Sequence, residues 1–254
     1  MAKKEQPKLF DIAIDKTSMS GNSEWGTFRD SLKAPIHGWF TYPAGFSQKA
    51  VEHFVGVHNL KPGKNVLFDP FMGSGTTNIV ANLQGIDSLG VEAHPFVFEI
   101  TKSKMDWDVD TKMAESIASQ FERFSKIPSL STLNKSNNEK FPELLHKCFL
   151  PNSLFVLGEI RDFLNETTMP KNVRRLLQTA LICSLRDVSI TATGWPYIAP
   201  KKTKITSMSK DPIVTLQKRV LKMLGDVQWA RENSHERESN HECVLGDSRK
   251  VSFP

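Results

Sequence analysis

Residues 66–77, VLFDPFMGSGTT, combine an acid and two glycines at a spacing that suits a small ligand. A strand-like run ends in Asp69, and a turn with Gly73 and Gly75 then leads into a helix. Glycine lets the backbone approach a ligand closely, and the first amides of a helix attract an anionic group. A P-loop would place a lysine where this chain has Thr76, and a dinucleotide fingerprint would add a third glycine. The pattern therefore favours a zwitterion, with its carboxylate at the amides and its ammonium at Asp69. A tight turn without a ligand is the alternative.

Two further acids follow short apolar runs. Glu92 ends the run LGVE, at the position where doubly wound folds place an acid that binds ribose hydroxyls. Asp247 follows the apolar run of Cys243, Val244 and Leu245. If all three runs are strands of one parallel sheet, their acids lie along the same edge. The alternative for each acid taken alone is an ordinary solvated side chain.

The elements that would position these acids are readable from the pattern. Residues 64–105 read as strand, helix, strand and helix, a unit that right-handed crossovers pack into a parallel sheet. We expect Thr76 or Thr77 to cap the first of these helices and Gly85 to end it. An earlier helix is expected to begin after Ser47 as its N-cap.

Residues 106–240 have a helical pattern instead. In PIVTLQKRVLKMLGDVQWA, the spacing predicts that Val214, Leu221, Leu224 and Val227 face the core. The run VRRLLQTALICSLRDVS predicts a second amphipathic helix, whose inward positions form a longer list. These positions are Val173, Leu176, Leu177, Ala180, Leu181, Ser184, Leu185 and Val188.

Composition bounds the class of protein. The chain has 254 residues, of which 39% are hydrophobic, so it can bury a substantial core. A net charge of +5 favours an anionic partner without naming one. The three cysteines lie far apart in apolar runs, which predicts reduced core residues and neither a disulfide nor a metal framework. No signal peptide and no apolar run of membrane-spanning length is present, which predicts a cytoplasmic protein without membrane contact.

The motifs DPFMGSGTT, GVEAHP and GDSR resemble the S-adenosylmethionine-binding half of DNA amino-methyltransferases, which methylate adenine N6 or cytosine N4. The resemblance implies that Glu92 binds the cofactor's ribose and that Asp247 faces its adenine. FTYPAGF is similar to a further motif of the family that packs on the methionine end, with ordinary core packing as the alternative. The resemblance assigns the remaining cofactor-binding positions to Phe40, Tyr42, Pro43, Phe46, Asp69, Pro70, Phe71, Gly73, Ser74, Gly75 and Thr76.

The catalytic motif of that family, an Asp/Asn/Ser-Pro-Pro-aromatic loop on the fourth strand, has no counterpart here. The chain contains no Pro-Pro pair, and its nearest imitation is GWPY at residues 194–197. The family's sheet has the strand order 3-2-1-4-5-7-6, of which this chain would supply strands 3, 2 and 1. We therefore expect an α/β fold with a partial Rossmann-like methyltransferase sheet and a large helical insertion, completed by a partner chain. No catalytic residue is expected in this chain, and a natural split and a truncated product both remain open.

The expected organisation has three parts. Residues 1–35 form an arm, residues 36–105 and 241–254 form the cofactor-binding half-domain, and residues 106–240 form the helical insertion. Lysines beside aromatic residues in the insertion predict a DNA-contacting region, because lysines neutralise phosphates and aromatic rings stack on bases. A solvated helix face is the alternative. The residues named for this role are Trp195, Tyr197, Lys201, Lys202 and Lys204.

The expected function is the S-adenosylmethionine-binding subunit of a site-specific DNA methyltransferase, with the catalytic loop on a second polypeptide. An RNA base methyltransferase subunit is the nearest alternative, since similar loops serve base methylation on RNA. A non-catalytic module that binds cofactor or DNA is an alternative of a different class.

Overall fold

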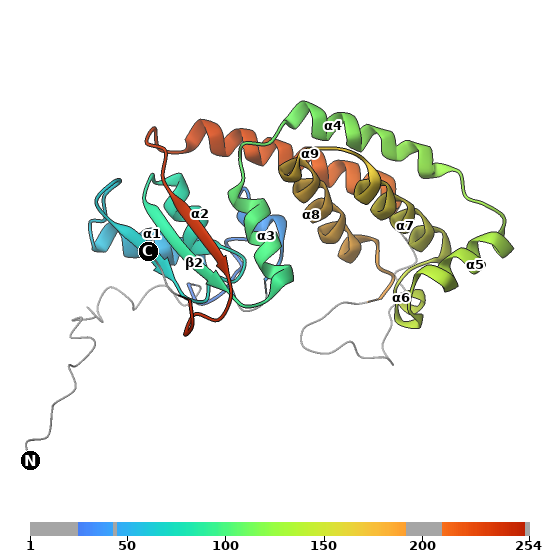
Figure 1. Cartoon of the computed structure of the whole chain (residues 1–254), viewed down its shortest axis with the longest axis horizontal. Coiled ribbons are helices and arrows are strands. Elements are labelled where there is room, and N and C mark those ends of the chain that lie inside the picture. Colours follow the sequence, from blue (N-terminus) through green and yellow to red (C-terminus); the bar gives the residue numbers. More distant parts are fainter. Residues whose placement is uncertain (1–24, 43–44, 192–209, 252–254) are drawn as a thin grey trace, which may run out of the picture.

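A computed structural model describes residues 25–42, 45–191 and 210–251 of the chain. A small parallel sheet with its covering helices forms one end of the elongated molecule, and a block of helices forms the other (Figure 1). The longest helix, α9 (Pro212–Asn233), runs from the helical block to the sheet. The tryptophan, tyrosine and lysines predicted to contact DNA at positions 195–204 lie outside the described residues.

The sheet has three parallel strands in the order β1-β2-β3. They are β1 (Val66–Asp69), β2 (Asp87–Glu92) and β3 (His241–Leu245). The predicted strands and the predicted order 3-2-1 are therefore confirmed. β3 pairs with β2 although almost 150 residues separate the two strands in the chain. The chain forms the helical block between them and then returns to the sheet.

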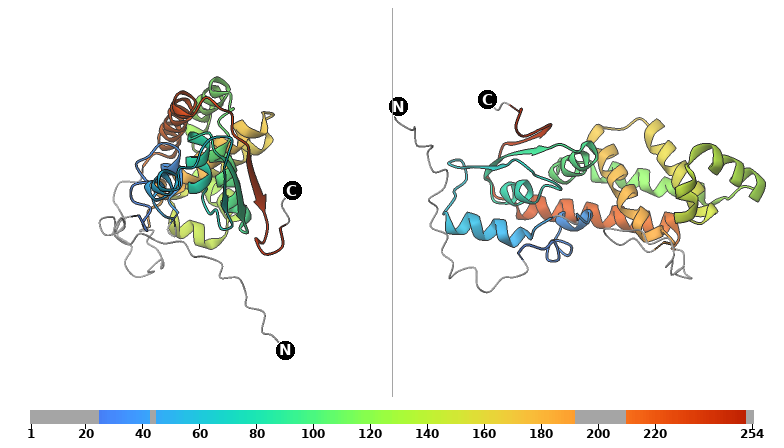
Figure 2. Two further views of the ribbon diagram at one scale, coloured as in Figure 1. Left: turned by 90° about the vertical axis from the view of Figure 1, so that its left-hand side faces the viewer. Right: turned by 90° about the horizontal axis from the view of Figure 1, so that it is seen from below.

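Three helices cover one face of the sheet, which Figure 2 shows from two further directions. They are α1 (Gln48–Val57), α2 (Thr76–Leu83) and α3 (Pro95–Met105). Leu67 of β1 points to this face and is buried against residues of α1 and α2. Because side chains alternate along a strand, Val66 and Phe68 point to the other face, where they are 63% and 50% exposed. Within the described residues no strand pairs with the outer edge of β1.

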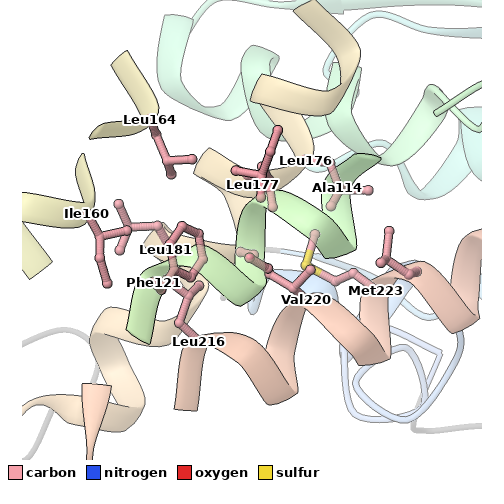
Figure 3. Close-up of a cluster of buried hydrophobic side chains, with 14 of the residues drawn as sticks. Ala114, Phe121, Ile160, Leu164, Leu176, Leu177, Leu181, Leu216, Val220 and Met223 are labelled. Atoms are coloured by element: carbon pink, nitrogen blue, oxygen red, sulfur yellow. The ribbon is translucent and has the colours of Figure 1, made fainter. Parts of the chain in front are cut away.

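The helical block lies between α3 and β3 in the chain. Its elements are α4 (Thr111–Ser119), the 3-10 helix η2 (Gln120–Ser125), α5 (Leu130–Lys140), α6 (Glu143–Cys148), α7 (Pro151–Glu166), α8 (Lys171–Val188) and α9. Apolar side chains of α4, η2, α7, α8 and α9 interdigitate in one large core (Figure 3). The inward face predicted for α8 is confirmed, with Leu185 only partly buried.

The predicted inward face of α9 is wrong at two of four positions. Leu224 and Val227 are buried, but Val214 is 45% exposed and Leu221 is 53% exposed. A helix turns by about 100° per residue, so Val214 and Leu221 point about 200° away from Leu216 and Met223, which follow them by two positions. Leu216 and Met223 belong to the face that packs on α4 and α8. It is formed by Leu216, Val220, Met223, Leu224, Val227 and Ala230.

Residues 25–40 connect the sheet end to α9. Asp226 of α9 accepts hydrogen bonds from Trp39 Nε1 at 2.8 Å and from the Ile36 amide at 3.2 Å, and it pairs with Lys222. Both Ile36 and Trp39 are buried. The 3-10 helix η1 (His37–Trp39) is thereby fixed immediately before Phe40, the first residue of the segment predicted to pack on the cofactor.

Among the described residues, no helix is both long and apolar enough to cross a membrane. The three cysteines, Cys148, Cys183 and Cys243, are free thiols and partly buried.

Candidate cofactor site at the carboxyl edge of the sheet

Asp69, at the end of β1, is tied to the start of α2. Its Oδ1 accepts from the Phe71 amide at 3.1 Å, and its Oδ2 accepts from Thr77 Oγ1 at 2.6 Å. The predicted cap of α2 by Thr76 or Thr77 is wrong, because the N-cap is Gly75 and the Thr77 hydroxyl is turned toward Asp69. Within the part of the chain that the structure describes, no side chain caps the first amides of α2. These amides are donors that an anionic ligand group can use.

The two glycines of the loop are required by its shape. Gly73 has φ +52° and Gly75 has φ +82°, in the region that favours glycine. A methyl group on Gly73 would lie 2.7 Å from the Tyr42 ring, and one on Gly75 would lie 2.7 Å from Thr101 Cγ2. The loop is thus pressed between the segment before α1 and helix α3.

Helix α3 binds two successive carbonyl groups of the loop. Thr101 Oγ1 donates to Gly73 O at 2.7 Å, and Lys104 Nζ donates to Ser74 O at 3.1 Å. In a trans peptide the N–H points away from the preceding C=O, so the Ser74 amide is directed away from α3. Thr101 and Lys104 were not among the predicted site residues. The sequence offered one signal for them. Both are hydrogen-bond donors, and they lie about one turn apart on a helix that was expected to pack against the sheet.

Glu92, at the end of β2, holds the loop from the other side. Its Oε2 accepts from the Gly73 amide at 3.0 Å, and its Oε1 accepts from the His94 amide at 2.7 Å. A carboxylate has about four acceptor sites, so both oxygens can still accept hydroxyl groups. Burial raises the pKa of Tyr42, and the charge of Glu92 raises it further, which places the phenol near this acid.

Asp247 lies at the same edge, beyond β3. Glu92 is in register with Leu245, and the Gly246 amide donates to Glu92 O at 3.0 Å. The Asp247 carboxylate is bound by its neighbour Arg249, whose Nη2 and Nε lie 2.7 and 2.9 Å from it. These bonds lower the pKa of Asp247. A ligand group that meets Asp247 would therefore share it with Arg249.

Aromatic side chains border the loop. Phe40 packs edge-on against Phe96 at the start of α3, with ring centroids 5.7 Å apart. Phe71 is 80% exposed and Phe46 is 36% exposed. Pro43 lies outside the described residues. Exposed rings of this size beside a polar loop provide an apolar surface for a ligand.

The residues present fit S-adenosylmethionine. Its carboxylate matches the uncapped amides of α2 and the outward Ser74 amide, and its ribose hydroxyls match Glu92. The Ser74 hydroxyl is buried and has no hydrogen-bond partner among the described residues, which leaves one more polar atom for a ligand or water. The structure thus brings together Phe40, Tyr42, the loop and Glu92, with Asp247 along the same edge.

Comparison with known proteins agrees with this geometry. Residues 5–103 match the family model of the N6/N4 DNA methyltransferases, described as DNA methylase. This part of the chain is similar to the N6/N4 DNA methyltransferase family. The matched residues include the glycine loop, Glu92 and most of α3. The small parallel sheet with its covering helices is consistent with a methyltransferase fold.

Three type II methyltransferases are similar to the chain. M.BsoBI of Geobacillus stearothermophilus is 31% identical over 39% of this chain, and M.MjaII of Methanocaldococcus jannaschii is 30% identical over 44%. M.MvaI of Kocuria varians is 24% identical over 95% of this chain. The matches cover 23%, 23% and 55% of these relatives' own lengths. No solved structure matches the chain.

We predict that Gly75→Ala destabilises the protein by about 2 kcal/mol, because alanine is strained at positive φ and its methyl group would collide with Thr101. Gly225→Ala is the matched control. Gly225 lies within α9, nothing is within 4 Å of the added methyl group, and alanine favours the helix by about 0.5–1 kcal/mol. Urea unfolding of both variants measures the difference. A Gly75→Ala protein as stable as the Gly225→Ala protein would contradict the strained-loop interpretation.

Proposed function

We propose that this chain is the cofactor-binding part of a site-specific DNA methyltransferase that methylates adenine N6 or cytosine N4. The observation that carries the proposal is the glycine loop. Its carbonyls are bound from behind by α3, and Glu92 and the uncapped start of α2 lie beside it. The family relationship and the named type II relatives support DNA as the substrate.

In this proposal each part of S-adenosylmethionine has a partner. The carboxylate is held by the Ser74 amide and the first turn of α2, and the ammonium is held by Asp69. Glu92 accepts from the ribose, and Asp247 faces the adenine. The remaining loop residues and two aromatic side chains cover the methionine end. They are Phe40, Tyr42, Pro70, Phe71, Gly73, Gly75 and Thr76.

The chemistry requires alignment more than activation. When bound, S-adenosylmethionine supplies a methyl group on a sulfonium, which is a good leaving group. The protein then has to hold the target amino nitrogen in line with that methyl group and exclude water, since correct placement lowers the barrier by several kcal/mol. The residues of this chain hold the donor. The target base has to be presented by other residues.

We place the base-presenting loop on a second polypeptide that pairs with β1. Two observations support this. The 254 residues contain no Pro-Pro pair, and among the described residues no strand pairs with the outer edge of β1, where Val66 is 63% exposed on the open face. An edge strand offers a row of free N–H and C=O groups to another strand. A strand added there would stand where the family places its fourth strand, which carries the catalytic loop.

The DNA contact is proposed for the exposed face of α9 together with Lys210, which lies just before this helix. A groove of about 560 Å³ is lined by Lys210, Lys218, Arg219 and Lys222, with Asp187 paired to Arg219 and Lys210. The excess of positive charge suits a phosphate backbone. In sequence, this groove directly follows the segment with Trp195, Tyr197, Lys201, Lys202 and Lys204.

We predict that Glu92→Gln weakens S-adenosylmethionine binding at least tenfold. The amide keeps only one acceptor oxygen, and its NH₂ group would face a backbone N–H of Gly73 or His94. Glu242→Gln on the exposed side of β3 is the matched control and should leave affinity unchanged. Isothermal titration calorimetry on the 254-residue chain measures both. Equal affinities for the two variants would remove Glu92 from the cofactor site.

The DNA face is tested by a Lys210→Gln, Lys218→Gln double variant. Each lost phosphate contact lowers the dependence of log K on log salt by about 0.9, so the slope should fall by up to about 2. Affinity for duplex DNA should fall roughly tenfold at low salt. Lys135→Gln with Lys147→Gln, on α5 and α6, is the control with the same change in charge. If both double variants bind alike, the α9 face is not the DNA contact.

Methyl transfer from labelled S-adenosylmethionine tests the proposal as a whole. The chain is incubated with unmethylated duplex DNA, alone and with the product of a neighbouring gene that has a Pro-Pro-aromatic loop. We expect N6-methyladenine or N4-methylcytosine only with the pair, and none when the chain carries Glu92→Gln.

The other outcomes separate the alternatives. Activity of the 254-residue chain alone, or only of a single longer chain, would overturn the second polypeptide. Labelling of RNA and not DNA would indicate the RNA base methyltransferase. Cofactor binding without transfer in any pairing would indicate a binding module.

A further inference from the structure

Lys104 is the most deeply buried charged side chain described in the protein. Its relative exposure is 0%, and its Nζ reaches the cofactor loop through the bond to Ser74 O. Nζ also lies 5.9 Å from the centre of the Phe28 ring. Among the described residues no carboxylate forms an ion pair with it. A buried cation without a counter-ion is costly, so its position behind a ligand loop requires an explanation.

The titratable groups that face Lys104 do not supply a counter-ion. His37 of η1 is neutral, since burial and the neighbouring Lys104 lower its pKa to about 3. Cys183 of α8 is a thiol, since burial raises its pKa to about 11. Beyond Cys183, Arg219 of α9 and Asp187 of α8 pair with each other. Glu92 lies on the ligand side of the loop, where it is bound to two backbone amides.

The peptide groups between Lys104 and the ligand side can transmit its charge. The charge-assisted hydrogen bond from Lys104 polarises the peptide group between Ser74 and Gly75, whose own N–H donates to Met72 O at 2.8 Å. The outward N–H is that of Ser74 in the preceding peptide group, which Thr101 orients through its bond to Gly73 O. The start of α2 adds positive potential at the same place. The loop therefore presents a positive surface whose strength depends on the charge of a residue that the ligand does not touch.

We propose that Lys104 is a positioning residue whose ammonium strengthens binding of the cofactor's carboxylate through the glycine loop. The inference rests on the proposed function, since it assigns the carboxylate of S-adenosylmethionine to this loop. In this arrangement the ligand's carboxylate is the counter-ion that the protein interior does not provide. The interaction crosses one layer of peptide groups from a fully buried ammonium, and charges in the protein interior interact more strongly than in water.

The sign of the pH dependence follows from burial. Burial lowers the pKa of Lys104 to about 7, so the free protein loses this charge near neutral pH. A bound carboxylate favours the ammonium and raises the pKa of Lys104 above that value. The extra affinity is therefore fully present below about pH 7 and is lost as pH rises through the raised pKa.

The first test uses the 254-residue chain without ligand. The backbone NMR resonances of Ser74 and Gly75 are followed from pH 6 to 8.5, and both should shift with an inflection near pH 7. Lys104→Met, which keeps a long apolar side chain, should abolish that inflection. Lys102→Met, on the same helix, should leave it intact. Flat resonances in the unsubstituted chain would overturn the proposal, and this readout needs no variant to fold.

The second test measures cofactor affinity over the same pH range. From pH 6 to 8.5 the ratio of wild-type to Lys104→Met affinity for S-adenosylmethionine should fall about three- to tenfold. Use of the ratio cancels titration of the ligand's own amino group. Decarboxylated S-adenosylmethionine should give a ratio that does not change with pH. A changing ratio for the decarboxylated ligand, or a constant one for both, would overturn the proposal.

The two tests separate this inference from the proposed function. If neither protein binds S-adenosylmethionine but Ser74 and Gly75 still titrate with Lys104, the cofactor assignment fails. The carboxylate-binding role fails with it, while the coupling of Lys104 to the loop stands. If the cofactor binds with a constant ratio, the proposed function stands and the role of Lys104 is overturned.

Discussion

The candidate site depends on the orientation of two peptide groups. The carbonyls of Gly73 and Ser74 point into the protein, and this is stable only because Thr101 and Lys104 satisfy them in the interior. Without these donors, a buried carbonyl would remain unpaired, and the loop would turn its oxygens toward solvent. A site lined by carbonyl oxygens would repel a carboxylate. The placement of two side chains on α3 therefore decides which charge the loop can bind.

This constraint connects the loop to the helical block. α3 pairs with α8 through Glu99 and Arg175, and Arg231 of α9 donates to two carbonyls in the segment that leads out of α3. Asp226 of α9 fixes the segment before Phe40. The long insertion between β2 and β3 is thus anchored to both segments that enclose the loop. The basic face of α9 and the cofactor site belong to one continuous framework, and this is a reason to assign them to one reaction.

Local patterns predicted much of this arrangement, because strand, turn and helix signals act over a few residues. The order of the three strands followed from the resemblance to the methyltransferase family, and the acids at 69, 92 and 247 lie at the strand ends as predicted. The sequence did not determine which face of α9 is buried. Apolar residues lie on two sides of this helix, and the elements that pack against it decide which side faces the core. The cap of α2 was misread for a related reason. Thr77 finds a better acceptor in Asp69 of the preceding strand, and Gly75 takes the cap position.

Thr101 and Lys104 could not be identified from sequence position alone. They lie 28 and 30 residues from the carbonyls they bind, and a lysine on a helix is ordinarily a solvated residue. Their role appears only when α3 is placed against the loop. Complete burial of a lysine with no acid partner among the described residues is the feature that then distinguishes Lys104 from the exposed lysines of this basic chain.

The open edge of β1 bears on how the site could work. In doubly wound sheets, ligands bind outside the carboxyl ends of the strands, in the crevice where the strand order reverses. With β1 at the edge of the described sheet, that crevice has one wall, and Phe71 at its mouth is 80% exposed. A second wall against β1 would bury Val66, Phe68 and Phe71 and enclose the loop. Enclosure excludes water from the place where the methyl group and the target nitrogen would meet, so the same added strand would complete the sheet and create the environment that transfer requires.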